Sequence, residues 1–223
     1  MRSFPRRAGN AARRRAIVAI GLAASIAAAC GGNHSPTAPM PPSDSGSGFA
    51  VTSAQFDQMF PGRNRFYTYA DLAAAAQSYP AFAGTGSADT RKQEMAAFLG
   101  NVAHETGRLV YIEQIAKADY CDATNTRYPC AAGKQYYGRG PLQLSWNYNY
   151  GAAGDALGRP LLASPEMVAQ VPTIAWQTAL WFWMTQAGAG TMTPHDAMVG
   201  GAGFGQTIRS INGALECGGG NPA

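Results

Sequence analysis

Residues 174–184 form an almost unbroken apolar run, and this run limits what the chain can fold into more than any other feature. The run reads IAWQTALWFWM and follows Pro172 and Thr173. A helix that is apolar on nearly every side is buried, whereas a surface helix carries a single apolar stripe. The sequence therefore predicts a core helix here, with Trp181, Phe182 and Trp183 inside the core.

Further helices are indicated from Thr52 onward. Thr52 with Gln55, and Thr90 with Gln93, match the capping-box pattern that starts helices. The alanine-rich residues 71–78 are a third helix candidate. Strands are expected to be few, and the fold class is predicted to be mainly α.

The first 50 residues differ in composition from the rest of the chain. Residues 1–29 resemble an export signal, with arginines at 13–15 ahead of an apolar stretch that is too short to span a bilayer. Residues 26–31 also resemble the cleavage box of bacterial lipoproteins, which implies a lipid anchor at Cys30; an ordinary secretory signal is the alternative. Residues 30–50, rich in Gly, Ser and Pro, are expected to be a tether. The protein is thus predicted to be secreted, or lipid-anchored on the outside of a bacterial cell.

The positive charge of the chain belongs to this leader. Residues 1–50 contain six Arg and one Asp, which leaves 11 basic and 12 acidic residues in 51–223. A folded part with this balance lacks the basic surface that a polyanion requires. We therefore expect no nucleic-acid partner, and a neutral polymer fits better.

Glu105 stands out as a candidate acid. On a helix it lies seven residues after Phe98, three after Val102 and four before Leu109, so its carboxylate projects along an apolar stripe. Desolvation keeps a carboxyl protonated to higher pH, which suits the proton donor of a glycosidase. The alternative is a glutamate at a helix edge that reaches into water.

A series of motifs decides between these interpretations. They are His104-Glu105-Thr106-Gly107, Tyr120-Cys121-Asp122, the segments 128–134 and 136–150, the segment 174–184, Gly203-Phe204-Gly205 and the segment 211–217. Taken together, and in this order, they resemble family 19 chitinases, in particular the short-loop members of class IV and of bacteria. The resemblance covers roughly residues 52–223, and Trp176 stands where the family usually has Phe.

The resemblance implies a two-lobed, lysozyme-like helical domain with a long substrate cleft. Members hydrolyse β-1,4-linked N-acetylglucosamine with inversion, using one glutamic acid as acid and a second as base for a water molecule. It implies chitin or chitin oligosaccharides as partner, no cofactor and no metal, and we expect a monomer. Residues 51–223 would form this catalytic domain, with membrane contact only through an anchor at Cys30.

The same resemblance assigns the site residues. Glu105 is the acid, and Ser145 helps to hold the attacking water. Substrate contacts are expected from polar side chains along the cleft, namely His104, Thr106, Gln143, Tyr148, Asn149 and Asn212. N-acetylglucosamine presents hydroxyls and an amide, which neutral side chains of this kind can recognise.

The second carboxylate is where the chain departs from the family. The base of short-loop members stands nine residues after the acid, and here that position is Gln114, preceded by Glu113. Adjacent residues of an extended chain point to opposite faces, so a shift of one residue decides which of the two faces the cleft. Either a one-residue deletion brings Glu113 into register as the base, which we favour, or the base is lost. Asp119 and Asp122 are weaker substitutes.

The same resemblance predicts how the cysteines pair and how the domain ends. Cys121 and Cys130 are expected to pair, which leaves Cys217 without the partner that the family supplies from a further helix. We therefore expect the catalytic domain to be truncated at its C-terminus.

Three functions remain open at this point. The first is an endo-acting chitinase. The second is a hydrolase that lyses peptidoglycan, which shares the β-1,4-N-acetylglucosamine motif. The third is a chitin-oligosaccharide-binding protein that has lost its base, and Gln114 is the residue that favours it.

Overall fold

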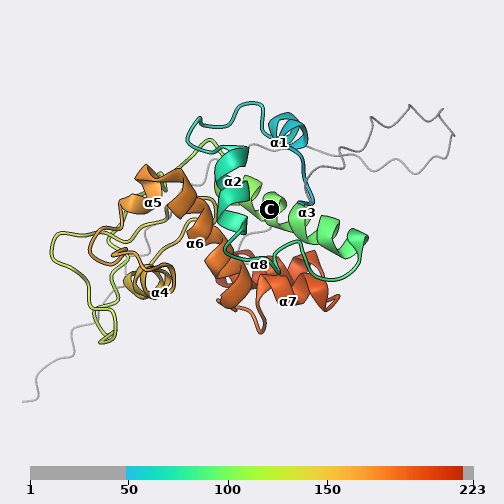
Figure 1. Ribbon diagram of the computed structural model, residues 1–223. Helices are drawn as coiled ribbons and strands as arrows, with labels where there is room; N and C mark the ends of the chain where they lie inside the picture. Colours follow the sequence, from blue (N-terminus) through green and yellow to red (C-terminus); the bar gives the residue numbers. More distant parts are fainter. Residues whose placement is uncertain (1–48, 218–223) are drawn as a thin grey trace, which may run out of the picture. The chain divides into compact units, whose positions relative to one another are not determined.

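The computed structural model describes residues 49–217. Its described part is helical, with extended pairing limited to isolated bridges that join Glu113 to Arg139 and Arg139 to Leu144. The helices, shown in Figure 1, are α1 (Ser53–Met59), α2 (Tyr69–Ala76), α3 (Ala88–Glu105), α4 (Asn147–Leu157), α5 (Met167–Gln170), α6 (Pro172–Thr185), α7 (Pro194–Val199) and α8 (Phe204–Glu216). The predicted mainly α fold class is confirmed.

Helix α6 is the predicted core helix. It begins with Pro172, whose fixed φ and missing N–H suit the first turn of a helix. Trp176 and Trp183 are fully buried, and Trp181 is nearly so. Phe182 differs from this expectation, because it is only half-buried.

The run is apolar on all sides because α6 contributes to two separate cores. The first core gathers buried side chains from α1, α2 and α3 around Trp176, Leu180 and Trp183. The second joins residues between 136 and 168 to Ile174, Ala175 and Trp181. Each face of α6 therefore meets its own hydrophobic cluster, which gives the two lobes of the fold.

The predicted helix starts are partly right. Thr52 and Gln55 make the capping box of α1 in both directions. The expectation for Thr90 is wrong: α3 begins at Ala88, and the Ser87 side chain accepts the hydrogen bond from the Thr90 backbone N–H. Thr90 instead places its hydroxyl 2.9 Å from that of Ser87, so an earlier cap starts the helix.

The leader lies mostly outside the described residues. The expected export signal (1–29), Cys30 with its anchor, most of the tether and the chain after Cys217 all fall there. Phe49, which we assigned to the tether, packs its ring against Tyr69 and Phe82, with centroids 6.2 and 6.4 Å apart. The packed domain therefore includes Phe49.

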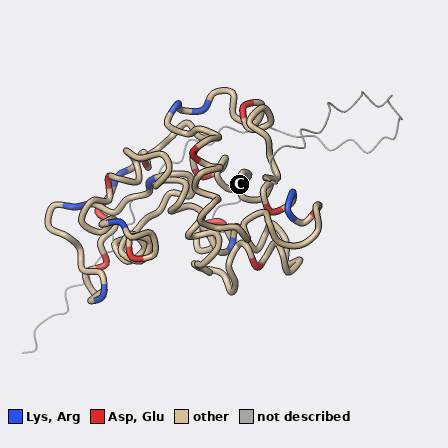
Figure 2. The backbone as a smooth tube through the Cα atoms, viewed as in Figure 1, with Lys and Arg blue, Asp and Glu red and all other residues tan. Residues whose placement is uncertain are grey.

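Charged side chains are sparse over the described chain. Figure 2 shows basic and acidic positions interspersed along the tube, separated by long uncharged stretches. None of the helices within residues 49–217 combines the length and the apolar character needed to cross a bilayer.

Candidate active site

One cleft brings together most of the residues predicted for the site. It encloses about 380 Å³, and we call it the main cleft. It is lined by Glu105, Gln114, Tyr120, Leu142, Gln143, Leu144, Ser145, Trp146, Asn149, Phe182, Ile211, Asn212 and Leu215. The lining thus comes from the end of α3, the segment after it, the loop before α4, and helices α4, α6 and α8.

Glu105 is the last residue of α3 and is largely shielded from solvent. Burial raises the pKa of its carboxyl to about 7, the nearby Glu216 carboxylate adds to the increase, and His104 opposes it. The C-terminal end of a helix also disfavours negative charge. Glu105 can therefore hold a proton near neutral pH.

His104 and Thr106, the two neighbours of Glu105, were predicted to contact the substrate, but they lie elsewhere. Thr106 is fully buried; its hydroxyl donates to the Val102 carbonyl and accepts from the Leu109 N–H, so it closes the end of α3. The His104 ring is exposed, with Nε2 3.2 Å from Glu216 Oε1. Neither residue lines the main cleft.

The loop before α4 supplies the polar lining. Ser145 Oγ donates to the Gln143 carbonyl at 2.8 Å, and Asn149 Nδ2 donates to the Ser145 carbonyl at 2.9 Å. Gln143 and Trp146 have positive φ of 49° and 75°, a region that non-glycine residues seldom adopt. Such strained residues persist only where the surroundings impose them, and they are frequent at functional sites.

Tyr148 and Asn212 complete the set of predicted contacts. Tyr148 is not part of the lining of the main cleft, but its ring stacks on that of Trp146, which is; the two rings are 12° apart in orientation and their centroids are 6.0 Å apart. Asn212 lines the cleft at a kink in α8, where its φ and ψ leave the helical region. Its Nδ2 donates to Glu216 Oε1 at 2.7 Å.

Glu113 and Gln114 lie where two hollows adjoin. Gln114 lines the main cleft, whereas Glu113 does not. Glu113 borders a second hollow of about 560 Å³, the side cleft, which Gln114 also lines, together with Lys117 and Glu166. The two hollows share Gln114, so Glu113 lies next to the wall of the cleft that contains Glu105.

Several cleft residues had no predicted role. Tyr120 and Trp146 lie in the motifs that carry the resemblance, and their rings meet edge to face with centroids 5.2 Å apart. Phe182 was assigned to the core, yet it lines the main cleft. Trp146 stands next to Asn147 in the sequence, and an aromatic residue beside an amide would have been its signal, whereas Tyr120 has no such neighbour. Phe182 gave no such signal, because it lies within the apolar run 174–184 and was therefore assigned to the core.

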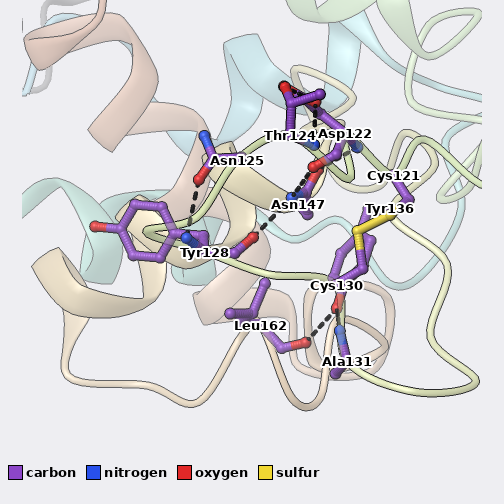
Figure 3. The surroundings of a disulfide bond; sticks show 10 residues. All are labelled: Cys121, Asp122, Thr124, Asn125, Tyr128, Cys130, Ala131, Tyr136, Asn147 and Leu162. Atoms are coloured by element: carbon purple, nitrogen blue, oxygen red, sulfur yellow. Dashed lines mark hydrogen bonds between the residues drawn. A yellow bond between two sulfur atoms is a disulfide. The ribbon is translucent and has the colours of Figure 1, made fainter.

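The disulfide lies in the segment after the acid. Cys121 and Cys130 are bonded, as predicted (Figure 3). Asn147 ties this loop to α4: its Oδ1 accepts from the Asp122 N–H at 2.8 Å, and its Nδ2 donates to the Tyr128 carbonyl at 2.7 Å. Cys217 forms no disulfide with the other cysteines in residues 49–217.

A metal site is not indicated. Within the described part of the chain, no group of three or more His, Cys, Asp or Glu side chains is placed to hold a metal ion.

Comparison with known proteins gives consistent matches. Chitinase 6 of rice (Oryza sativa subsp. japonica) is 51% identical over 176 residues, which are 78% of this chain and 62% of that protein. Endochitinase A of maize (Zea mays) is 53% identical over 163 residues, 73% of this chain and 55% of that protein. The chain therefore spans somewhat more than half the length of these relatives.

Solved structures agree with these matches. Chitinase C from Streptomyces griseus superposes with a TM-score of 0.76 at 62% identity, covering 80% of this chain and 87% of that one. A class IV chitinase from Zea mays, of glycoside hydrolase family 19, gives 0.69 at 48% identity, covering 78% and 84%. These structures share the lysozyme-like helical fold. The model of the class I chitinase family matches residues 50–223, and the chain belongs to this family, glycoside hydrolase family 19.

Proposed function

We propose that the protein binds chitin oligosaccharides in the main cleft and hydrolyses their β-1,4-N-acetylglucosamine linkages, with Glu105 as the acid. The observation that carries this proposal is a shielded carboxyl with a pKa of about 7 on the wall of an uncharged cleft. A glycosidase acid must be protonated when it meets the leaving-group oxygen. Glu105 meets that requirement near neutral pH.

The lining suits a neutral amino sugar. Gln143, Asn149 and Asn212 offer amides, and Ser145 offers a hydroxyl, for the sugar's hydroxyl and acetamido groups. The exposed ring of Trp146 offers an apolar face for a sugar ring. Among the described residues that line the main cleft, Glu105 is the only one with a carboxyl group, and none is a lysine or an arginine.

Membership of the family supports inversion. A water molecule would attack the anomeric carbon from the face opposite the leaving group, so a β-linked substrate yields the α-anomer. Ser145 is proposed to help hold that water. Proton NMR of the sugar, taken before mutarotation, identifies the anomer, and a β-anomer would contradict this mechanism.

The test compares the wild type with Glu105→Gln on soluble chitin oligomers. The amide keeps the shape of the side chain but cannot donate a proton as the carboxylic acid does, so release of reducing ends should fall by the ~10²–10⁴ that acid–base assistance contributes. Oligomer binding should stay near wild type. Asp89→Asn, at the opposite end of α3, is the matched control. A variant that retains more than a tenth of the activity would exclude Glu105 as the acid.

The same variants, assayed in parallel on bacterial cell walls, test the alternative that the protein lyses peptidoglycan. Clearing of peptidoglycan by the wild type, with no release from chitin oligomers, would replace chitin by the bacterial wall as substrate.

We further propose that the protein acts as a monomer outside the cell, either secreted or lipid-anchored at Cys30. The proposed location is supported by the predicted export signal.

A further inference from the structure

We propose that Lys117 is a positioning residue for the base of the reaction: its ammonium group holds the Glu113 carboxylate beside the wall of the main cleft, where it takes a proton from the attacking water. The proposal rests on the proposed function and adds to it the cation that orients the second carboxylate. Inverting hydrolysis needs two carboxyl groups, roughly 6.5–9.5 Å apart, to leave room for the water. Between Glu105 and Asp119 the sequence contains one further carboxylate, Glu113.

The backbone fixes the place of Glu113. Glu113 forms an isolated antiparallel bridge with Arg139. Beside it, the Gln114 N–H donates to the Gly138 carbonyl at 2.8 Å, and the Gln114 side-chain oxygen accepts from the Gly138 N–H at 3.0 Å. Because Gln114 lines both clefts, this pairing holds Glu113 where the side cleft adjoins the main cleft.

Three side chains hold the Glu113 carboxylate. Lys117 Nζ donates to Oε2 at 2.6 Å, the Tyr137 hydroxyl donates to Oε1 at 2.9 Å, and Arg139 Nε lies 3.4 Å from Oε1. Lys117 Nζ also lies 4.9 Å from the centre of the Tyr137 ring. A cation is attracted to the face of an aromatic ring, so the ring helps to keep the lysine in place.

These contacts leave one carboxylate oxygen free to accept from a water molecule. Each oxygen of a carboxylate has about two lone-pair sites. Oε1 of Glu113 faces both Tyr137 and Arg139, whereas Oε2 has a single partner among the described residues, Lys117. The Glu113 side chain is 32% exposed, so water reaches it. We therefore assign the proton transfer to Oε2.

The surroundings of the two glutamates act in opposite directions. Burial raises the pKa of Glu105 to about 7. Partial burial alone would raise the pKa of Glu113 too. Hydrogen bonds from Lys117 and Tyr137, with the charges of Lys117 and Arg139, prevail and lower the pKa of Glu113. Two carboxyl groups whose pKa values move apart are suited to act as acid and base.

Lys117 is the replaceable member of this cluster. Arg139 is 4% exposed, donates to the Tyr150 hydroxyl at 2.9 Å and lies over the Tyr137 ring, so its removal would leave buried groups without a partner. Lys117 is 46% exposed, and its described side-chain contacts are with Glu113 and Tyr137. Replacing Lys117 therefore tests the carboxylate without opening the core.

A second lysine provides a matched control. Glu166 also borders the side cleft, and its Oε1 lies 2.9 Å from Lys134 Nζ. Among the described residues, no hydrogen bond or ion pair joins this pair to Glu113. Lys134→Met thus breaks a lysine–glutamate pair beside the same hollow and spares the proposed base.

The proton transfers balance with Lys117 as a bystander. Glu105 gives its proton to the leaving oxygen as the C1–O bond breaks, while the water bonds to C1 and gives a proton to Glu113. The products are an α-anomer and the hydroxyl of the departing sugar, and exchange with solvent restores both glutamates. The hydrogen bond with Glu113 raises the pKa of Lys117, so Lys117 stays a cation throughout.

The experiment measures kcat and KM of the full chain on soluble chitin oligomers across pH. Lys117→Met keeps the aliphatic stem but removes the charge, so kcat should fall by ~10–10², with KM within about twofold of wild type. The acidic limb of kcat should move to higher pH, because the pKa of Glu113 rises without the lysine and a base acts only when ionised. Lys117→Arg should restore most of the activity and the wild-type limb. Lys134→Met should leave both unchanged.

Two further measurements separate positioning from a structural role. Carbon-13 NMR of the glutamate carboxyls, without substrate, should show a higher pKa of Glu113 in Lys117→Met, with Glu113→Gln identifying the signal. Glu113→Gln should itself lower kcat by ~10²–10⁴. Adding Lys117→Met to Glu113→Gln should lower kcat no further, whereas a structural role would lower it by the same factor in both backgrounds.

The outcomes distinguish this proposal from the proposed function. A Glu113→Gln variant as active as wild type would overturn the proposal while leaving Glu105 as the acid. So would a Lys117→Met variant with unchanged kcat and acidic limb, or with an equal loss in both backgrounds. If Glu105→Gln is as active as wild type, the proposed function fails, and the proposal fails with it.

Discussion

The carboxylate of Glu216 lies 3.2 Å from the Nε2 atom of His104, the residue that precedes the proposed acid. This contact joins α8 to the end of α3. Burial is the main cause of the raised pKa of Glu105, and the Glu216 carboxylate raises it further. Glu216 Oε1 also accepts a hydrogen bond from the Asn212 amide. Glu216 therefore acts on the acid through charge and on the cleft wall through Asn212.

Glu216→Gln should shift the pH dependence of hydrolysis. Removing a negative charge favours ionisation of Glu105, so the pKa of Glu105 falls. The acid is active when protonated, and the alkaline limb of kcat/KM should therefore move to lower pH. Rates on chitin oligomers between pH 4 and 9 measure this limb. Glu166→Gln, which breaks the ion pair with Lys134, should leave it in place. An alkaline limb that moves upward or stays fixed would contradict the proposed coupling.

Glu105→Gln should stabilise the protein at alkaline pH. The pKa of Glu105 is raised to about 7 in the folded state, so the folded protein binds more protons than the unfolded chain as the pH rises from about 4.5 to 7. Stability falls with pH in that window, by up to about 3 kcal/mol for a shift of this size. The amide does not ionise, so it avoids this loss.

Denaturant unfolding at pH 5 and pH 8 tests the prediction. The gain in unfolding free energy of Glu105→Gln over wild type should be larger at pH 8 than at pH 5. An equal gain at both pH values would mean that the Glu105 carboxyl ionises normally in the folded protein.

The sequence predicted features that depend on local pattern. The apolar run became α6, and Thr52 with Gln55 became a capping box. Thr90 with Gln93 failed because Ser87, three residues earlier, also matches a cap, and pattern alone does not rank the two. These successes and this failure concern signals that span only a few residues.

The register of the second carboxylate depends on tertiary geometry. Gly107, Arg108 and Leu109 all have positive φ, from 56° to 65°. The chain after α3 therefore turns through three residues in the left-handed region, two of which are not glycine. Side-chain preference does not predict such a turn. The turn helps to set where Glu113 and Gln114 lie relative to Glu105.

Removing the disulfide should lower stability and weaken binding. Cys121 and Cys130 are nine residues apart, and closing a loop of this size is worth roughly 2–3 kcal/mol. The Cys121→Ser/Cys130→Ser variant should have a lower melting temperature. Its affinity for oligomers should also fall, because the bonded loop follows directly after Tyr120 in the cleft wall. Cys217→Ser is the control, and an equal effect there would contradict the assigned pairing.

Two tryptophans of α6 offer a matched test of buried polar groups. Trp176 and Trp183 are both fully buried in the first core. Trp183 Nε1 donates to Glu94 Oε1 at 3.0 Å, and Glu94 is itself fully buried, where it also meets His195 Nδ1 at 2.7 Å. Trp176 Nε1 has no hydrogen-bond partner among the described residues. The same substitution therefore removes a hydrogen bond at one position and an unpaired donor at the other.

Trp183→Phe should cost more stability than Trp176→Phe, by roughly 1–3 kcal/mol. Both changes remove similar aromatic area from one core, so the cost of the cavity largely cancels between them. Trp176→Phe also relieves the burial of an unpaired N–H, while Trp183→Phe takes a donor from the buried Glu94 carboxylate. Denaturant unfolding of the two variants at one pH measures the difference. Equal losses would mean that the Trp183 hydrogen bond contributes nothing net, and a larger loss for Trp176→Phe would show that its ring packing outweighs the unpaired donor.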